Sequence, residues 1–372
     1  MKSRKQSISS KILGTIKNID AYGYPIGLTY KNSRTFQSTL GGAFTIAARL
    51  GIMVFFILEI INVLNKQSIL KTTSYIRDLS VDQTEYLFDQ ENYDIAVKLQ
   101  YQAKIFKGKN ITDQLHKYAY AQIRQIGFSF SLQDGQVIFR QKDHVFKLVK
   151  CDSTRFKGEQ VVANNLGIRD SFQCPEDLKF SLKGNFQSNF LKYLKIEILR
   201  CNQTYLDQNY QGQQCESDED IDEVFKKLEF YVPAMNSFFD STSYDQVIKK
   251  GIINYYFTTA GSKMSQNYLL KLGQNNVILK DSPISKNINN QNITFNTLKP
   301  FYSLNSHVSD YFTPLAITII LDDEVVTFER EVYTLFDALA TTGGFIGIIN
   351  IVCRSLTSAL QKLLFYFSIY IH

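Results

Sequence analysis

The sequence predicts a membrane protein in which two transmembrane α-helices flank a mainly β domain of sandwich-like, α+β character. Three observations lead to this class: an apolar stretch near each end of the chain, a charge excess confined to the N-terminal arm, and strand-like alternation between the two stretches. A bilayer core about 30 Å thick is crossed by roughly 20 helical residues. Both apolar stretches are long enough to cross it.

The N-terminal arm, residues 1–40, is basic. It carries seven Lys and Arg residues against one acidic residue, Asp20, so the formal net charge of +6 lies entirely before the first span. Short basic flanks remain on the cytosolic side of a membrane, and we therefore expect both termini to be cytosolic. Segment 8–19 has apolar residues at helical spacing, which indicates either an amphipathic helix on the membrane surface or a loosely ordered tail. The dispersed charges do not favour nucleic-acid binding.

The apolar stretches divide the rest of the chain. We expect the first transmembrane helix at 41–65, a luminal or extracellular β-rich domain at 66–333, and the second helix with a short cytosolic tail at 334–372. The first apolar run begins roughly 40 residues into the chain without a cleavage-site pattern. No cleavable signal peptide is therefore expected.

Three charged residues lie in or near the spans, where charge is costly and marks function or an interface. Arg49 lies in the N-terminal half of the first span, and Glu59 lies near its far end. Arg354 marks the cytosolic exit of the second helix if the hydrocarbon portion is Leu335–Cys353, which is the arrangement we favour. A later span would leave Arg354 within the membrane, where it would need an acidic partner.

Both spans begin with small residues. Such residues let helix backbones approach closely in lipid, so we predict packing of the two spans, or of neighbouring subunits in a homo- or hetero-oligomer. The alternative is a flexible junction between strand and helix. The residues are Gly41, Gly42, Thr45, Gly343, Gly344 and Gly347.

Four cysteines lie within the middle domain and predict two disulfide bonds in an oxidising compartment. Three connectivities are open, and the nearest-neighbour pairing is favoured. Zinc is disfavoured because there is no Cys-x-x-Cys pair and the four histidines are scattered, so we expect no metal or cofactor. The cysteines are Cys151, Cys174, Cys201 and Cys215.

The same domain holds three N-glycosylation sequons, at Asn110, Asn202 and Asn292. Chance alone predicts about three in a domain so rich in Asn, Ser and Thr. The topology permits glycosylation at these sites without requiring it.

Alternating apolar and polar residues predict strands through the middle domain. Segment 128–151 alternates on both sides of Asp134 and Gly135, which indicates a hairpin. Four further segments are predicted as strands: 93–106, 193–201, 251–260 and 316–334. The last of these segments, 316–334, contains a predicted turn at Asp322 and Asp323.

One segment of the middle domain, 217–230, predicts an amphipathic helix with Ser217 as its N-cap. Its expected apolar face comprises Ile221, Val224, Phe225 and Leu228. The acidic residues also have the spacing of a calcium loop, but Glu223 stands where such a loop needs glycine. A helix without metal is therefore the prediction. Residues 275–306, rich in Asn, Ser and Lys, indicate a long loop.

The two membrane junctions resemble those of a known family. Segment 17–60 contains Asp20, Ala21 and Tyr22 followed by Gly41, Gly42, Thr45 and Glu59, and segment 329–349 contains Gly343 and Gly344. These motifs are similar to those of the ER–Golgi intermediate compartment (ERGIC/Erv) cargo-receptor proteins, although Ser38 stands where threonine is usual.

The resemblance covers roughly 60 residues and leaves the middle domain unassigned. It implies an early secretory-pathway membrane protein that has a luminal β-rich domain and cycles in transport vesicles between ER and Golgi. The cysteine-rich luminal stretch of larger members is missing, so cargo binding does not carry over.

The leading functional expectation is a non-enzymatic, cargo-receptor-like or membrane-assembly protein with luminal protein clients. The alternative is a subunit of a two-span ligand-gated ion channel of the purinergic or acid-sensing type. In that case Thr341, Thr342, Gly343 and Asn350 are candidates to line a pore. An enzyme is not expected, because the sequence has no Gly-x-Ser-x-Gly, His-Glu-x-x-His or phosphate-binding glycine loop.

Overall fold

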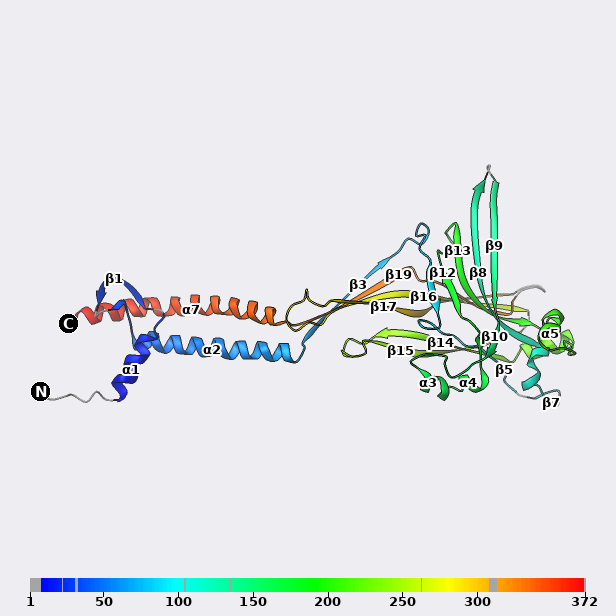
Figure 1. The fold of residues 1–372 in the computed structure, drawn as a ribbon, viewed down its shortest axis with the longest axis horizontal. Coiled ribbons are helices and arrows are strands. Elements are labelled where there is room, and N and C mark those ends of the chain that lie inside the picture. Colours follow the sequence, from blue (N-terminus) through cyan, green and yellow to red (C-terminus); the bar gives the residue numbers. More distant parts are fainter. Residues whose placement is uncertain are drawn as a thin grey trace. The chain divides into compact units, whose positions relative to one another are not determined.

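The computed structural model describes residues 8–21, 23–30, 33–103, 105–133, 136–261, 263–307 and 313–370. The chain divides into two compact units. The membrane unit comprises Met1–Leu70, Leu279–Gln291 and Glu329–His372, and the β unit comprises Lys71–Ile278 and Asn292–Phe328. Figure 1 labels many of the elements of the two units.

The membrane unit holds two long apolar helices. With 26 and 36 residues, they are about 39 and 54 Å long at 1.5 Å per residue. Only 11% of the most apolar window of each is buried inside the protein, whereas a core helix of a soluble protein is mostly buried. The helical and strand elements of this unit are α1 (Ile8–Asn18), β1 (Tyr24–Tyr30), β2 (Ser33–Phe36), α2 (Thr39–Leu64) and α7 (Leu335–Tyr370).

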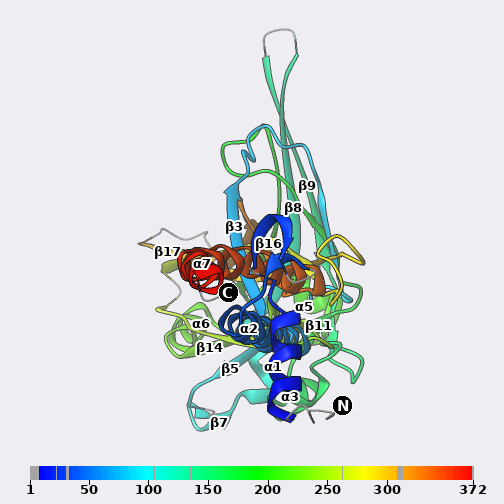
Figure 2. The ribbon, with the colours of Figure 1, turned by 90° about the vertical axis from the view of Figure 1, so that its left-hand side faces the viewer.

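Helices α2 and α7 pack side by side and antiparallel (Figures 1 and 2). The rings of Phe55 and Phe345 stack with their centroids 4.3 Å apart, while Gln361, further along α7, lies beside Gly41, earlier in α2. The buried positions of α7 recur every fourth residue over much of its length, which is the ridge that one helix presents to another. They are Ala338, Thr342, Cys353, Thr357 and Gln361.

The N-terminal arm is more structured than its sequence indicated. Residues 8–18 form α1, so the prediction of an amphipathic helix is confirmed for this segment and the prediction of a loosely ordered tail is wrong. The arm also contains the antiparallel pair of β1 and β2, which the sequence analysis missed. The tail expected after Arg354 is not a separate segment, because α7 continues without a break to Tyr370.

The β unit is built on an eight-stranded sheet in the order β3-β19-β16-β18-β13-β8-β9, with β17 also paired to β16. Strands β3, β16, β17 and β19 carry residues of both units. The strands are β3 (Ser68–Ile76), β8 (Ala119–Gln133), β9 (Gln136–Phe146), β13 (Phe190–Arg200), β16 (Met264–Lys280), β17 (Gln291–His307), β18 (Leu315–Leu321) and β19 (Glu324–Val332).

A second, three-stranded sheet has the order β15-β14-β5, and side chains of both sheets share one buried cluster. The domain is therefore mainly β and sandwich-like, as the sequence predicted. The shared cluster includes Ile196, Ile198, Ile317, Ile319, Phe230 and Val232. The second sheet consists of β5 (Lys98–Tyr101), β14 (Leu228–Phe239) and β15 (Ile248–Thr258).

Short strand pairs and helices complete the β unit. The strand pairs are β4 (Tyr86–Asp89) with β12 (Lys179–Leu182), β6 (Ile105–Phe106) with β7 (Lys109–Asn110), and β10 (Leu148–Lys150) with β11 (Gln173–Pro175). The helices are η1 (Thr112–Lys117), α3 (Gln160–Asn165), α4 (Ile168–Ser171), α5 (Gln203–Asn209) and α6 (Asp218–Phe225).

The predicted hairpin in segment 128–151 is present as β8 and β9. The pairing runs as far as Gln133 opposite Gln136. Asp134 and Gly135, the expected turn, lie outside the described residues, as does Tyr22 of the N-terminal motif. The remaining predicted strands correspond to β5 with β6, β13, β15, and β18 with β19.

Two expectations for the β unit were wrong. Residues 275–306 are not a long loop, because their polar side chains bond between strands: the Asn275 amide donates to Thr297 Oγ1 at 2.7 Å and its oxygen accepts from the Val326 backbone at 2.9 Å. The helix predicted at 217–230 ends at Phe225, and Leu228 instead begins β14.

Asp322 and Asp323 do not form a hairpin turn. Strand β18 lies on one side of β16, with Leu321 opposite Leu272, and β19 lies on the other side of β16. The two aspartates therefore carry the chain across β16 at Gly273. A Cβ atom at Gly273 would lie only 2.8 Å from Asp322 Cβ, so this crossing needs glycine.

We predict that Gly273→Ala lowers the free energy of unfolding by about 1–3 kcal/mol, because an added methyl group must push the crossing chain away. Thermal unfolding of the purified protein measures the effect. Gly127→Ala in β8 is the matched control, since its Cβ would meet its nearest neighbours at an ordinary 3.6 Å. Equal melting temperatures for the two variants would contradict this account of the crossing.

Candidate functional site

A buried polar cluster joins three segments of the membrane unit. The carboxylate of Asp20 accepts a hydrogen bond from the Ser38 backbone at 3.2 Å and from Gln361 Nε2 at 2.9 Å. Ser38 caps α2 by accepting from the Gly41 backbone at 3.0 Å. Gln361 is fully buried and Asp20 is nearly so. Because burying such groups is costly unless they are hydrogen-bonded, this cluster fixes the N-terminal arm, the start of α2 and α7 together.

The small residues at the start of α2 leave room for α1 and for Gln361 of α7 to pack against α2. A Cβ atom at Gly41 would lie 2.2 Å from Gln361 Nε2, and one at Gly42 would lie 2.2 Å from the carbonyl oxygen of Ile16 in α1. Thr45 Oγ1 donates to the Gly41 carbonyl at 2.9 Å and accepts from the Ala21 backbone at 3.2 Å. Asp20, Ala21, Gly41, Gly42 and Thr45 of the N-terminal motif therefore meet in one place.

The opposite end of the helix pair has a second polar connection. Glu59 of α2 interacts with the side chain of Tyr333, which precedes α7, and accepts from the amide of Asn62 at 3.4 Å. The hydroxyl groups of Tyr333 and Thr341 lie 3.1 Å apart. Glu59 is thus held at the far end of the span, where the sequence analysis placed it.

The glycines of α7 have a different position from those of α2. Within the described part of the chain, no heavy atom lies within 4 Å of a Cβ built at Gly343, Gly344 or Gly347. These three residues are exposed. They face away from α2, so packing of the two spans does not use them.

The two arginines of the helix pair lie near one level. The contacts of Gly41 with Gln361 and of Phe55 with Phe345 set the antiparallel register. In that register Arg49 and Arg354 are close to opposite each other along the pair, and both side chains are exposed. Both guanidinium groups therefore lie on the outside of the helix pair at a similar depth.

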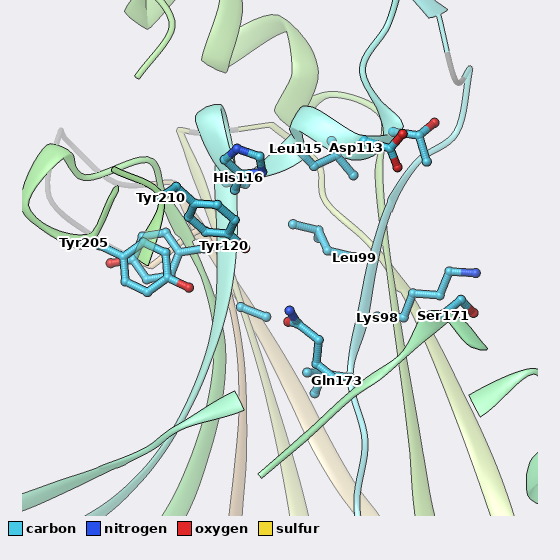
Figure 3. Close-up of a pocket in the computed structure, with 14 residues that line it drawn as sticks. Lys98, Leu99, Asp113, Leu115, His116, Tyr120, Ser171, Gln173, Tyr205 and Tyr210 are labelled. Carbon is cyan, nitrogen blue, oxygen red and sulfur yellow. The ribbon is translucent and has the colours of Figure 1, made fainter. Parts of the chain in front are cut away.

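The β unit contains a cleft of about 240 Å³ (Figure 3). Residues of β5, η1, β8, α4, β11 and α5 with the residue that follows it line the cleft. Aromatic rings gather on one side in Figure 3, with Lys98 and Ser171 on the other and the Gln173 side chain directed between them. The labelled lining residues also include Leu99, Asp113, Leu115, His116, Tyr120, Tyr205 and Tyr210.

The aromatic wall consists of two parallel ring stacks. The rings of Tyr120 and Tyr205 stack at 3.8 Å, and those of His116 and Tyr210 stack at 3.9 Å. His116 Nε2 also lies 2.5 Å from Gln213 Oε1. Burial, together with the neighbouring phenols of Tyr210 and Tyr120, raises the pKa of Tyr205 to about 12. The wall is therefore well packed, and the phenol of Tyr205 is neutral near pH 7.

A disulfide bond holds this wall. Cys201–Cys215 encloses α5 and so confines Tyr205, Tyr210 and Gln213 to one closed loop. Asn202 caps α5 by accepting from the Thr204 backbone at 2.8 Å. The second bond is Cys151–Cys174, so the nearest-neighbour pairing that the sequence favoured is confirmed. Closing loops of this size typically contributes about 3 kcal/mol.

The three sequons and the acidic residues of α6 all lie in the β unit. Asn110, Asn202 and Asn292 are all exposed and belong to the β unit. The acidic residues of α6 form ion pairs: Asp218 and Asp222 contact Arg200, and Asp220 contacts Lys107. These partners explain the acidic start of α6 in addition to the Ser217 cap, which accepts from the Asp220 backbone at 3.2 Å.

The cleft was missed by sequence reasoning. Two tyrosines inside a short cysteine-bounded loop, Tyr205 and Tyr210, were the available signal. Their partners His116 and Tyr120 come from a distant segment, so only the fold brings the four rings together.

These features define the class: an integral membrane protein with two candidate membrane-spanning helices and a mainly β domain between them. A family model described as "uncharacterised 80 kDa protein N-terminal domain" matches residues 96–322, which is more than half of the chain. The chain belongs to this family. The matched residues lie between the two spans and contain both disulfide bonds and the cleft.

Comparison with solved structures finds neighbours of low similarity. A structure titled "Cryo-EM structure of a proton-activated chloride channel" has a TM-score of 0.32 and 8% identity, covering 87% of this chain and 99% of that one. "Crystal Structure of Erv41p" has a TM-score of 0.23 and 7% identity, covering 70% and 99%. These scores carry no argument about function. No curated protein matches.

We predict that Gly42→Ala releases α1 from α2, because the added methyl group would overlap the backbone of Ile16. Overpacking of about 1–3 kcal/mol should raise tryptic cleavage in α1 at least about fivefold. Limited proteolysis of the detergent-solubilised protein, followed through an N-terminal tag, measures this rate. The control is Gly51→Ala in the same helix, which meets no described atom within 4 Å. Equal cleavage rates in the two variants would show that α1 does not depend on this contact.

We also predict that Tyr205 ionises near pH 12 in the native protein rather than near the ordinary value of about 10. Its raised native pKa leaves stability unchanged below about pH 10 and lowers it as the pH rises from 10 toward 12. The difference in phenolate absorbance between the wild type and Tyr205→Phe isolates this titration. Repeating it in denaturant should return the midpoint to about 10, and a native midpoint already at that value would refute the burial of this phenol.

Proposed function

We propose that this protein is a non-enzymatic receptor of the early secretory pathway, resembling the ERGIC cargo receptors, that binds clients in the ER or Golgi lumen through its β unit. The observation that carries the proposal is the buried cluster of Asp20, Ser38 and Gln361. It unites the N-terminal motif and the glycine entry of α2, which resemble that family, with Gln361 of α7, which lies beyond the resembling segment 329–349.

The proposed orientation has independent support. The basic arm favours cytosolic termini. Two disulfide bonds in the β unit suit an oxidising lumen, and all three sequons are exposed on that same unit. The cleft, with its disulfide-bonded aromatic wall, then opens to luminal clients.

Oligomerisation forms part of the proposal. Gly343, Gly344 and Gly347 leave one face of α7 open to a neighbouring helix, and small residues favour such contacts in lipid. This same observation favours the second candidate function, a subunit of a two-span ion channel. In a channel, this face of α7 would line the pore or contact the next subunit.

The orientation is tested in microsomes with a tag on each terminus. We expect both tags to be digested by added protease, and the middle domain to be protected and to carry N-glycans that disappear when Asn110, Asn202 and Asn292 are changed to Gln. Unglycosylated, protease-accessible β units would overturn the proposed orientation.

The choice between receptor and channel rests on a different readout from the same preparation. A receptor should be recovered in budded transport vesicles and show no conductance in planar bilayers. A reproducible current that changes with Gly343→Leu would replace the receptor proposal with the channel. Gly51→Leu on the first span is the matched control for a bulky side chain facing outward.

A further inference from the structure

The cleft of the β unit has the size and chemistry of a sugar-binding site. We infer that it binds a single neutral hexose ring, presented by a glycan. This inference deepens the proposed receptor function and rests on it, because the cleft then faces the compartment in which proteins acquire N-glycans.

The size of the cleft limits the ligand. Its volume of about 240 Å³ is below the roughly 300–1,000 Å³ of sites that hold drug-sized molecules. One six-membered ring suits this space. The walls are fixed by the Cys201–Cys215 bond on one side and by the pairing of β10 with β11 near Gln173 on the other.

The aromatic wall supplies the stacking surface. An aromatic ring carries negative charge density on its faces, which attracts the C–H hydrogens that line one face of a pyranose. The stacks of Tyr120 with Tyr205 and of His116 with Tyr210 occupy one face of each ring, and we assign an outer face of this wall to the ligand. Because each ring is held by its partner, the surface is already in place before a ligand binds.

The polar groups of the cleft select a hydroxylated, uncharged ligand. Gln173 can both donate and accept hydrogen bonds, and Asp113 accepts. The Ser171 hydroxyl already donates to the Gly167 carbonyl at 3.1 Å, and the Lys98 ammonium lies over the rings of Phe172 and Tyr231. The charges of Lys98 and Asp113 balance, so neither an anion nor a cation is favoured. The aromatic side chain of a peptide would cover these groups without hydrogen-bonding them, which is costly. A sugar ring satisfies them with its hydroxyl groups.

The test uses the full-length protein in detergent after enzymatic removal of its N-glycans. Saturation-transfer NMR is recorded with the methyl glycosides of mannose, glucose and N-acetylglucosamine. We expect at least one to bind with a dissociation constant on the order of 1 mM. Tyr205→Ala and Gln173→Ala should each weaken binding at least about tenfold. Tyr75→Ala, which changes an exposed tyrosine of β3 outside the cleft, should leave it unchanged.

Three results would overturn the inference: no transfer to any of the three glycosides, equal binding by Tyr205→Ala and Tyr75→Ala, or competition by N-acetyltyrosine amide at lower concentration than the best glycoside. Gln173→Ala keeps the aromatic wall, and a count of free thiols shows whether Cys201–Cys215 has formed, so loss of binding is separated from misfolding. The assay does not depend on membrane orientation. If no glycoside binds but the β unit is glycosylated and protected in microsomes, the sugar inference fails and the receptor proposal stands. If a glycoside binds but the β unit is cytosolic, the sugar inference stands and only the receptor proposal fails.

Discussion

The arrangement of the membrane unit depends on one buried carboxylate. Asp20 is nearly enclosed by protein, and its oxygen accepts from the capping residue of α2 and from the amide of Gln361. An acidic group in such a place is tolerated only when donors surround it. This requirement explains the glycine beside Asp20, because a larger side chain at Gly41 would displace those donors. It also fixes the point at which α2 and α7 meet.

Sequence reasoning succeeded where a signal was local and periodic. From hydropathy, the predicted first residue of each span lies within two residues of the first residue of the observed helix. Alternation around a two-residue turn identified the β8–β9 pair. Cysteine order favoured the pairing that the structure contains. Each of these features is decided by neighbouring residues, so the chain reveals it without a fold.

Elsewhere tertiary contacts overrode composition. Asn275 belongs to a segment whose polarity indicated a loop, but its side chain bonds to two other strands. Leu228 continued a helical pattern and nevertheless began β14. The cleft could not be anticipated, because its rings come from distant segments: Tyr120 and Tyr205 are 85 residues apart. Likewise, the distance between Asp20 and Gln361 along the chain hid their hydrogen bond.

That last separation has a consequence for biosynthesis. The two partners are 341 residues apart, and ribosomes add about 5–20 residues per second. The first span therefore waits on the order of 20–70 s before the glutamine that completes its polar cluster has been made. During this interval the aspartate must rely on water, lipid headgroups or a chaperone. A truncated chain that stops before Gln361 would present an incomplete anchor, which gives quality-control machinery a means to distinguish unfinished molecules from finished ones.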